Sequence, residues 1–500
     1  MEDLLDAADA LVANHPDGDP PRPNFDFPMD YDSNTPHALM EIRESCHGNT
    51  SRGKGWFAKQ DIPAGAILII DKPLAMVMNW QDDVHGEEGE GEAEEEDIEM
   101  SDDEEQEEEQ FSSLNEMLLL ELLQEIKQKP SIWAENLSNL YPRDHQTAMT
   151  LPMWVCQDDE VFALVEASFQ ELQKVPELDE QSVKDIKYRL PLIIRYNCLS
   201  VETCPELLVH PGPGGHVALG GTAVYYLPSF FNHDSRPNAS RYAVGDIMWF
   251  VANQDVKAGE EICISYLEHD VLCEDSNIRT NMLQMDFADE NVIENNVLST
   301  SMTDIPEGGE EKITDAPDFP VVDDLVQSEL MSMEPVERLE AIQQLYDQAT
   351  GKANPEGEIE ETGENMEEGI EGVAWFQCDV QNLQILRAIT LDGQGKSDEA
   401  MKEWEECVKF AVTKLPPVDE NAIAMQVQAA LCARCVGKMD LAKKYAEAAL
   451  VSHDILFGGG VERFRRRYHR EVQLTLRPDN GSFESGGFAA LDELWPVQMA

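Results

Sequence analysis

The residues that favour β-strands lie in two stretches that are far apart in the sequence. Residues 41–80 and 191–270 both alternate glycine-rich turns with short apolar runs, a pattern typical of strands joined by tight turns. Residues 113–190 instead place apolar residues three and four positions apart, which indicates helices. We therefore expect an α+β chain in which a helical insert at 113–190 separates two β-rich halves.

An acidic low-complexity run precedes the helical insert. Residues 87–109 contain sixteen Asp and Glu and no Lys or Arg. Such a segment cannot bury enough apolar surface to offset the entropy of ordering it, so we expect a disordered acidic insert at 81–112. The formal net charge is −63, and −47 remains without these acids. This charge argues against nucleic-acid binding, while a basic protein partner and plain solubility both remain open as its purpose.

The sequence gives no sign of membrane insertion or secretion. No run approaches the ~20 apolar residues that span a bilayer, and the acidic N-terminal segment, 1–40, lacks the basic region of a signal peptide. The scattered cysteines suit a reducing compartment, so we expect the nucleus and/or the cytoplasm. The segment RFRRRYHR at 463–470 is compatible with a nuclear signal, a phosphate-binding patch or a solvated helix face, and the last is favoured.

Two groups of potential metal ligands are interpreted as structural residues. Cys432 and Cys435 form a CxxC pair inside a helical pattern, and no second pair lies nearby. A zinc site needs about four ligands, so buried helix cysteines are favoured over a metal site. His210 and His216 lie among glycines and prolines, which favours a flexible loop.

The C-terminal part of the chain is expected to be helical. Residues 298–322 are rich in Ser, Thr, Gly, Pro and acids and are expected to form a linker. Within 323–470, two segments begin Gly-Lys-x-Asp-x-Ala, at Gly395 and at Gly437. The Gly can close one helix and the Asp can cap the next, which predicts helical hairpins of a tetratricopeptide-like domain. Residues 471–500 are expected to form a C-terminal tail.

Three short motifs carry a family resemblance when they are taken together. They are RGKGWFA at 52–58, SFFNHDSRPNA at 229–239 and AGEEICISY at 258–266. Each is weak alone, but in this order the chain resembles the SET-domain protein methyltransferases. The matched features are the Arg-Gly-x-Gly-aromatic-aromatic-Ala pattern, the Asn-His pair and the Gly-Glu-Glu…Ser-Tyr ending. The resemblance implies a SET domain over 41–270, with short β-sheets and a pseudoknot around the Asn-His segment.

The chain looks most like the SMYD type of this family, with two departures. No cysteine lies between Cys46 and Cys156, so the MYND zinc finger is absent. Ser235 stands where the family has a zinc-binding Cys, and Ala288-Asp289-Glu290 replaces the post-SET Cys-x-Cys. Residues 271–297 are therefore expected to be a post-SET remnant in which ordinary packing replaces the zinc, and we expect no metal.

The resemblance also implies which residues form the site. S-adenosylmethionine is the implied cofactor. The implied cofactor-binding residues are Lys54, Gly55 and Trp56, largely through their main chain, together with Asn197, Asn232, His233 and Tyr266. The implied catalytic residue is Tyr266, and candidates for the channel of the substrate lysine are Tyr225, Tyr226 and Phe250.

These features predict a protein-lysine N-methyltransferase acting on a basic protein, either a histone or another protein. The alternative is a SET-fold scaffold with little or no activity, which binds other proteins through its helical C-terminal domain. The loss of both halves of the zinc site keeps this alternative open. Nucleic-acid and membrane partners are not expected.

The acidic insert gives a first prediction. Deletion of residues 84–110 should leave the melting temperature within a few degrees of the wild type, because this segment has few apolar side chains to pack. Thermal unfolding of the purified variant measures this. A large drop in melting temperature would show that the run packs into the fold.

Overall fold

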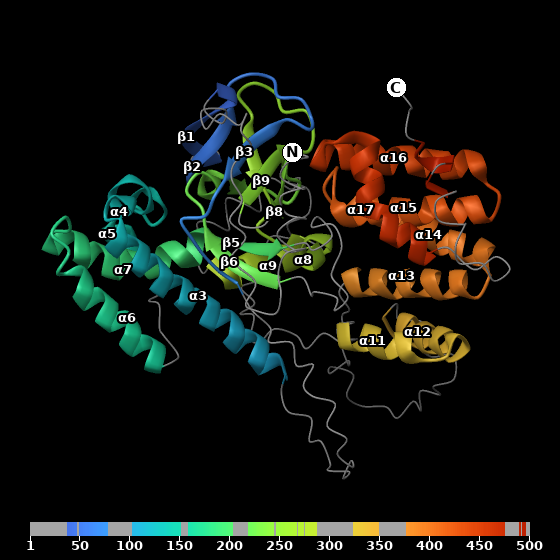
Figure 1. Ribbon diagram of the computed structural model, residues 1–500, viewed down its shortest axis with the longest axis horizontal. Helices are drawn as coiled ribbons and strands as arrows, with labels where there is room; N and C mark the ends of the chain where they lie inside the picture. Colours follow the sequence, from blue (N-terminus) through green and yellow to red (C-terminus); the bar gives the residue numbers. More distant parts are fainter. Residues whose placement is uncertain are drawn as a thin grey trace, which may run out of the picture.

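The structure, a computed structural model, describes most of the chain between residues 38 and 496. The described residues are 38–47, 50–78, 103–151, 159–203, 219–244, 247–267, 269–274, 276–287, 324–349, 377–475, 490–491 and 493–496. The expected linker at 298–322, His210 and His216, and most of the expected acidic insert and N-terminal segment lie outside these residues. Figure 1 shows three parts side by side: insert helices, central small sheets and C-terminal helices.

The described strands form three small sheets. The strands are β1 (Met40–His47), β2 (Thr50–Ala58), β3 (Ile67–Asp71), β4 (Ala75–Met78), β5 (Cys198–Thr203), β6 (Leu219–Val224), β7 (Asn232–His233), β8 (Ala239–Val244), β9 (Ile247–Ala252) and β10 (Glu261–Ile264). The strand orders are β1-β2-β10-β7, β3-β9-β8 and β4-β6-β5. Each sheet combines strands from both β-rich halves of the sequence.

The first sheet has the last strand in its interior. β10 pairs antiparallel with β2, through Glu261 opposite Phe57 and Ile262 opposite Trp56. On its other side it pairs parallel with β7. The late strand therefore inserts between two earlier ones, which is the kind of threading that we expected around the Asn-His segment.

The second sheet separates two hydrophobic cores. Every residue of β9, sequence IMWFVA, is buried. Met248, Phe250 and Ala252 belong to the core shared with the insert helices. Trp249 and Val251 alternate with them and belong to the core of the C-terminal helices. Because successive side chains of a strand point to opposite faces, a continuous apolar run is what a strand covered on both faces requires.

The helical insert is present, with different boundaries from those expected. Its helices are α3 (Asp103–Gln128), α4 (Ser131–Glu135), α5 (His145–Ala148), α6 (Asp159–Leu172) and α7 (Glu180–Asn197), with the short 3-10 helix η1 at Leu137–Asn139. Leu118, Leu122 and Ile126, spaced four apart on α3, are fully buried. Helix α3 already begins inside the range 81–112 that we expected to be disordered, so residues 103–112 are helical.

The C-terminal part consists of helices that pack as successive hairpins. The helices after β10 are α8 (His269–Cys273), α9 (Ser276–Phe287), α11 (Asp324–Ser332), α12 (Pro335–Ala349), α13 (Gln377–Gly393), α14 (Ser397–Lys414), α15 (Glu420–Cys435), α16 (Met439–Phe457) and α17 (Gly460–Thr475). The hairpins α13–α14 and α15–α16 turn at Gly395 and Gly437, whose φ angles are 81° and 76°. Hairpins are therefore present at both Gly-Lys-x-Asp-x-Ala segments, while their assignment as tetratricopeptide-like stays a prediction.

The capping role of the aspartates in these segments was predicted wrongly. Lys396 and Lys438 are the N-cap residues of α14 and α16, and neither makes a side-chain cap. Asp398 and Asp440 lie in the first turn instead, where a carboxylate is favoured by the positive end of the helix dipole. An aspartate cap does occur on α15, where Asp419 accepts from the backbone N–H groups of Asn421 and Ala422.

The basic segment at 463–470 is not the solvated face that we favoured. Arg463 is buried and donates to the carbonyl of Phe457. Arg467 pairs with Glu420 and lies 4.1 Å from the centre of the Phe457 ring. Two of its arginines therefore attach α17 to neighbouring helices, while Arg466 is exposed.

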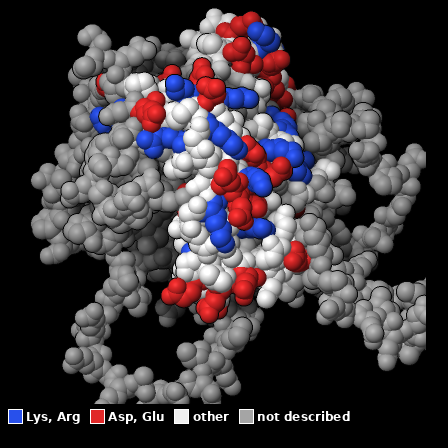
Figure 2. Space-filling view, turned by 90° about the vertical axis from the view of Figure 1, so that its right-hand side faces the viewer, with Lys and Arg blue, Asp and Glu red and all other residues white. Residues whose placement is uncertain are grey.

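Part of the expected C-terminal tail is packed into the helical core. Trp495 is 1% exposed, and its indole N–H donates to the carbonyl of Ala446 at 2.9 Å. Figure 2 shows the outer face of the helical part, where Lys and Arg are interspersed with Asp and Glu. The charge of the chain is therefore not spread as a uniform acidic layer over this face.

The remaining sequence expectations concern cysteines and membranes. Cys432 is buried in α15 as expected, but Cys435 is exposed. Among the described residues, no helix is long and apolar enough to cross a membrane.

His453 is a buried titratable group in the helical core. It is fully buried on α16, and neither ring nitrogen has a hydrogen-bond partner among the described residues. The rings of Phe457, Phe464 and Tyr468 surround it. Burial, aided by the positive charge of Arg463, lowers the pKa of His453 to about 3.

This burial predicts a specific loss of stability in acid. Because folding lowers this pKa, the His453 imidazole becomes protonated near pH 6.5 in the unfolded chain but stays neutral at that pH in the folded chain. Stability is then lost as the pH falls below about 6.5. His453→Phe should gain about 2 kcal/mol relative to the wild type between pH 7 and pH 5. Urea unfolding at both pH values measures this, and a difference that does not change with pH would contradict it.

Candidate functional site

The three sequence motifs meet around strand β10. The parallel ladder places Cys263 opposite Asn232 and Ile264 opposite His233. On the other side of β10, Ala58 donates its N–H to the Glu260 carbonyl at 2.9 Å. One short strand therefore brings together segments that are about 170 residues apart in the sequence.

Tyr266 is held by the Asn-His segment. Its backbone N–H donates to Nδ1 of His233 at 2.9 Å, and its hydroxyl donates to the carbonyl of Phe231 at 2.6 Å. The ring centres of His233 and Tyr266 are 5.5 Å apart. His233 is buried, whereas Tyr266 is partly exposed. Both ends of Tyr266 are thus fixed by residues adjacent to Asn232.

Gly55, Asn232 and Glu261 form a cradle without a side chain at its base. Asn232 Nδ2 donates to Glu261 Oε1 at 2.5 Å, and Ser45 Oγ donates to Glu261 Oε2 at 2.8 Å. A Cβ added to Gly55 would lie 2.3 Å from Glu261 Oε1 and 2.6 Å from Asn232 Nδ2. Any residue other than glycine would therefore disturb this pair, and Asn232 keeps its amide oxygen for another donor.

The loop after the Asn-His pair contacts both the small sheets and the C-terminal helices, which are called here the β-rich lobe and the helical lobe. Asn238 donates to the carbonyl of Glu261 at 2.9 Å and accepts from the N–H of Cys263 at 2.9 Å. Arg236 donates to the carbonyls of Thr413 and Leu415, at the C-terminal end of α14. A cation is favoured at the negative end of a helix dipole. The loop is thereby joined to β10 and to the helical part.

The other expected cofactor residues lie around this cradle in different ways. Trp56 is fully buried, and its indole N–H donates to the Leu227 carbonyl at 3.0 Å. Its main chain lies between β1 and β10, opposite Ile42 and Ile262. Lys54 lies opposite Glu44 in the β1–β2 ladder. Asn197 ends α7 and donates to the carbonyls of Tyr141 and Ile193. Their roles as cofactor residues stay predictions.

The three expected channel residues do not lie in equivalent places. Tyr225 and Phe250 are fully buried in the core, where Phe250 stacks on Phe231 at 4.9 Å. Neither side chain reaches a surface that a lysine could enter. Tyr226 is partly exposed and packs against Phe230. The expectation of a channel wall therefore rests on Tyr226 alone.

Apolar packing occupies the segment where the family zinc site would lie. Leu267, Val271, Leu272 and Leu283 form a small buried cluster, and Tyr266 packs against it. Among the described residues, no group of three or more His, Cys, Asp and Glu side chains could hold a metal ion. The interpretation that ordinary packing replaces the zinc stays a prediction, because Ala288-Asp289-Glu290 lie outside the described residues.

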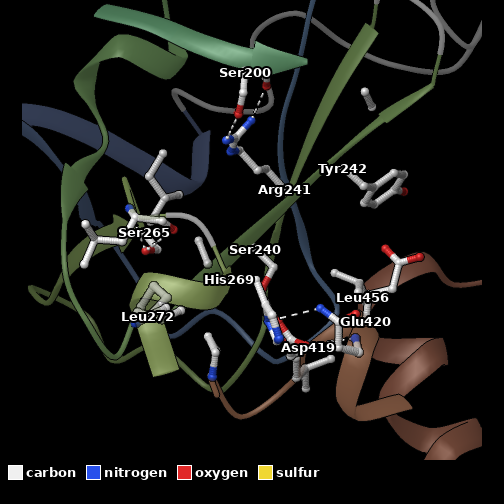
Figure 3. A pocket seen from close by; sticks show the side chains of 18 of the residues that line it. Ser200, Ser240, Arg241, Tyr242, Ser265, His269, Leu272, Asp419, Glu420 and Leu456 are labelled. Carbon is white, nitrogen blue, oxygen red and sulfur yellow. Dashed lines mark hydrogen bonds between the residues drawn. The ribbon is translucent and has the colours of Figure 1, made fainter. Parts of the chain in front are cut away.

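A pocket of about 560 Å³ lies between the β-rich part and the C-terminal helices. Ile264, Ser265 and Leu267, at and after the end of β10, line it, while Tyr266 does not. Figure 3 shows its lining residues from both sides, with Ser240, Arg241 and Ser265 on the β-rich side and Asp419 and Glu420 on the helical side. Asn421 and His269 meet across it at 3.1 Å. Burial raises the pKa of Asp419. No sequence motif indicated this pocket, because it depends on how the two lobes dock.

Sequence reasoning missed several side chains of the site. Glu261 and Asn238 lie inside the quoted motifs, so their position was a usable signal. Ser45 carried none. Arg236 occupies a variable position of the motif, and its partners on α14 are about 180 residues away.

Comparison with known proteins agrees with this geometry. The sequence model of the SET domain family matches residues 53–267. A stretch of 46 residues is 44% identical to a Saccharomyces cerevisiae protein named "Potential protein lysine methyltransferase SET6". The matched stretch is 9% of this chain and spans about an eighth (12%) of the yeast protein. The expected fold class, a SET domain with small sheets followed by a helical region, is confirmed, and a methyltransferase function is supported.

Asp71, at the end of β3, gives a prediction for the segment that leads into the site. Its carboxylate accepts from the N–H of Leu227 at 3.4 Å, and from the N–H of Lys72 at 3.0 Å. Burial raises the pKa of Asp71 to about 7. Because this pKa is raised on folding, the stabilising contribution is present below pH 4 and is lost as the pH rises through 7.

Asp71→Asn should therefore be more stable than the wild type at pH 8, by a few kcal/mol at most. This advantage should shrink toward pH 5, where the wild-type carboxyl is protonated. Chemical unfolding at the two pH values measures the difference. An equal difference in stability between the variant and the wild type at both pH values would mean that Asp71 does not titrate in this range.

Proposed function

We propose that the protein transfers a methyl group from S-adenosylmethionine to a lysine side chain of a protein substrate. The observation that carries the proposal is the arrangement around β10. The same strand holds Asn232 at the cradle and leads into Tyr266, whose hydroxyl is fixed by Phe231. The SET domain match over residues 53–267 supports the same activity.

The residues of the cradle fit the cofactor. Gly55 lets the main chain of β2 lie directly against the side chains of Asn232 and Glu261, where a Cβ would clash. The Asn232 amide oxygen can accept from an ammonium group, and the Glu261 carboxylate favours positive charge nearby. When bound, S-adenosylmethionine supplies an electrophilic methyl group on a positively charged sulfur.

The protein must also accept a lysine in its neutral form. With an ordinary pKa of ~10.4, about one lysine in 2,500 is neutral at pH 7, a cost of ~4.6 kcal/mol. Desolvation beside Tyr266 and its apolar neighbours lowers a lysine pKa, and a bound positive charge lowers it further. Tyr266 keeps its hydroxyl at one place through the bond to Phe231, so that the oxygen can orient the amine for in-line attack.

The substrate is proposed to be a basic protein, histone or non-histone. The net charge of −63 favours encounter with a basic partner. The pocket that Asp419 and Glu420 partly line offers acidic side chains to a segment of a basic substrate. Action in the nucleus or cytoplasm, the SMYD-like type and partner binding by the helical domain belong to the same proposal.

Tyr266→Phe tests the catalytic role. The change removes one hydroxyl and little volume, so the fold should survive and cofactor affinity should change modestly. Turnover should fall at least ~100-fold, the scale of losing one oriented polar group in a closed site. Asn232→Ala should instead weaken cofactor binding first. Calorimetry and methyl-transfer rates, with a basic protein fraction as substrate, separate the two effects.

The outcome also separates the enzyme from the scaffold. A Tyr266→Phe variant with the full wild-type rate would remove Tyr266 from catalysis. A wild-type protein that binds cofactor but methylates nothing in a whole-cell extract would favour the scaffold instead.

A further inference from the structure

A cation from the helical insert lies near the Gly-Lys-Gly segment of strand β2. Arg143 stands in the segment between η1 and α5. A Cβ added to Gly53 would lie 3.8 Å from Arg143 Nη2, and Gly53 has a φ of 80°, a conformation that favours glycine. The guanidinium group is therefore in van der Waals reach of the segment that we expect to contact the cofactor.

The guanidinium of Arg143 has unused hydrogen-bonding capacity. Its Nε is buried and has no hydrogen-bond partner among the described residues, which also contain no ion-pair partner for it. Arg189 of the same insert differs, because its guanidinium donates to Pro142, Asp185 and Ser138. The fork of an arginine matches a carboxylate in two parallel hydrogen bonds. The Arg143 guanidinium can therefore bind a carboxylate.

The same segment touches the residue expected at the methionine end of the cofactor. Asn197 donates its side-chain N–H to the Tyr141 carbonyl at 2.6 Å. Two residues later the chain reaches Arg143, near Gly53. Residues 141–143 therefore link Asn197 to the Gly-Lys-Gly segment of β2.

The acidic groups around the site favour a cation at the end that receives the cofactor carboxylate. Glu261 lies in the cradle, and Glu44 lies opposite Lys54 in the β1–β2 ladder. Both carboxylates favour the ammonium and sulfonium groups of S-adenosylmethionine but repel its carboxylate. The field of Glu44 also acts on Arg143, whose pKa is lowered by partial burial. A cation at Arg143 offsets the repulsion at the methionine end.

We propose that Arg143 binds the carboxylate of the methionine moiety, so that the helical insert completes the cofactor site. This inference rests on the proposed function, because it needs S-adenosylmethionine as the ligand. Arg143 is then a recognition residue for the amino-acid part of the cofactor, distinct from the cradle residues Gly55 and Asn232.

Binding of two nucleosides tests the inference without measuring activity. S-adenosylhomocysteine carries the amino-acid carboxylate, and 5′-methylthioadenosine lacks the whole amino-acid end. Titration calorimetry of the full chain should show that Arg143→Gln loses about 10- to 100-fold in affinity for S-adenosylhomocysteine, the scale of a charge-assisted hydrogen bond. Affinity for 5′-methylthioadenosine should be unchanged.

Two further variants complete the experiment. Arg143→Lys keeps the charge and should retain part of the affinity for S-adenosylhomocysteine, which also serves if Arg143→Gln fails to fold. Lys174→Gln removes an exposed positive charge from the end of the insert helix α6, and should change neither affinity. Thermal unfolding without ligand checks that each variant is folded.

Each result decides between the two proposals. Equal losses for both nucleosides would mean that Arg143 only supports the local structure, and this would overturn the inference. Unchanged affinity for S-adenosylhomocysteine in a folded Arg143→Gln variant would also overturn it, while the proposed function would stand. A wild-type protein that binds neither nucleoside would remove the proposed function, and the inference with it.

Discussion

The insertion of β10 between β2 and β7 is the interaction on which the rest of this structure depends. A strand in the interior of a sheet must satisfy its backbone on both sides, so its two neighbours fix its position. Here these neighbours carry the Gly-Lys-Gly segment and the Asn-His pair. Tyr266 lies two residues after the end of β10 and is held by His233 of β7 and by Phe231, which directly precedes β7. The site is thus inseparable from the threading of the chain.

Polar side chains transmit this order across the sheet. Glu261 joins three segments, because Asn232 and Ser45 donate to its carboxylate while its backbone pairs with β2. Asn238 pairs with the backbone of β10 as a strand would. Such networks are costly when only partly satisfied, so they favour one arrangement over nearby alternatives. This explains how a sheet of short strands can hold a precise cradle at Gly55.

The sequence was informative where the evidence is local. Turn glycines and apolar periodicity predicted the β-rich halves, the insert helices and the hairpins at Gly395 and Gly437, and the motifs predicted which segments would meet. It was uninformative where long-range docking decides. The burial of Tyr225 and Phe250 could not be inferred, because an aromatic residue in a strand, or directly after one, is equally compatible with a core and with a channel. The arginines of 463–470 were misjudged for the same reason, since their partners lie on other helices.

The absence of the family cysteines changes how the site is supported. The chain after Tyr266 packs Leu267, Leu272 and Leu283 into a small core. Arg236 joins the loop after the Asn-His pair to the end of α14 through two carbonyls. The apolar cluster is stabilised by burial, and the exposed Arg236 is stabilised by modest hydrogen bonds. Neither is as rigid as a tetrahedral zinc site. The support is instead shared with the C-terminal helices, because Arg236 donates to the end of α14 and Trp249 of β9 belongs to the same core as Trp404 of α14. The helical lobe is therefore part of the framework of the site, and its docking belongs to the same structural problem as the cradle itself.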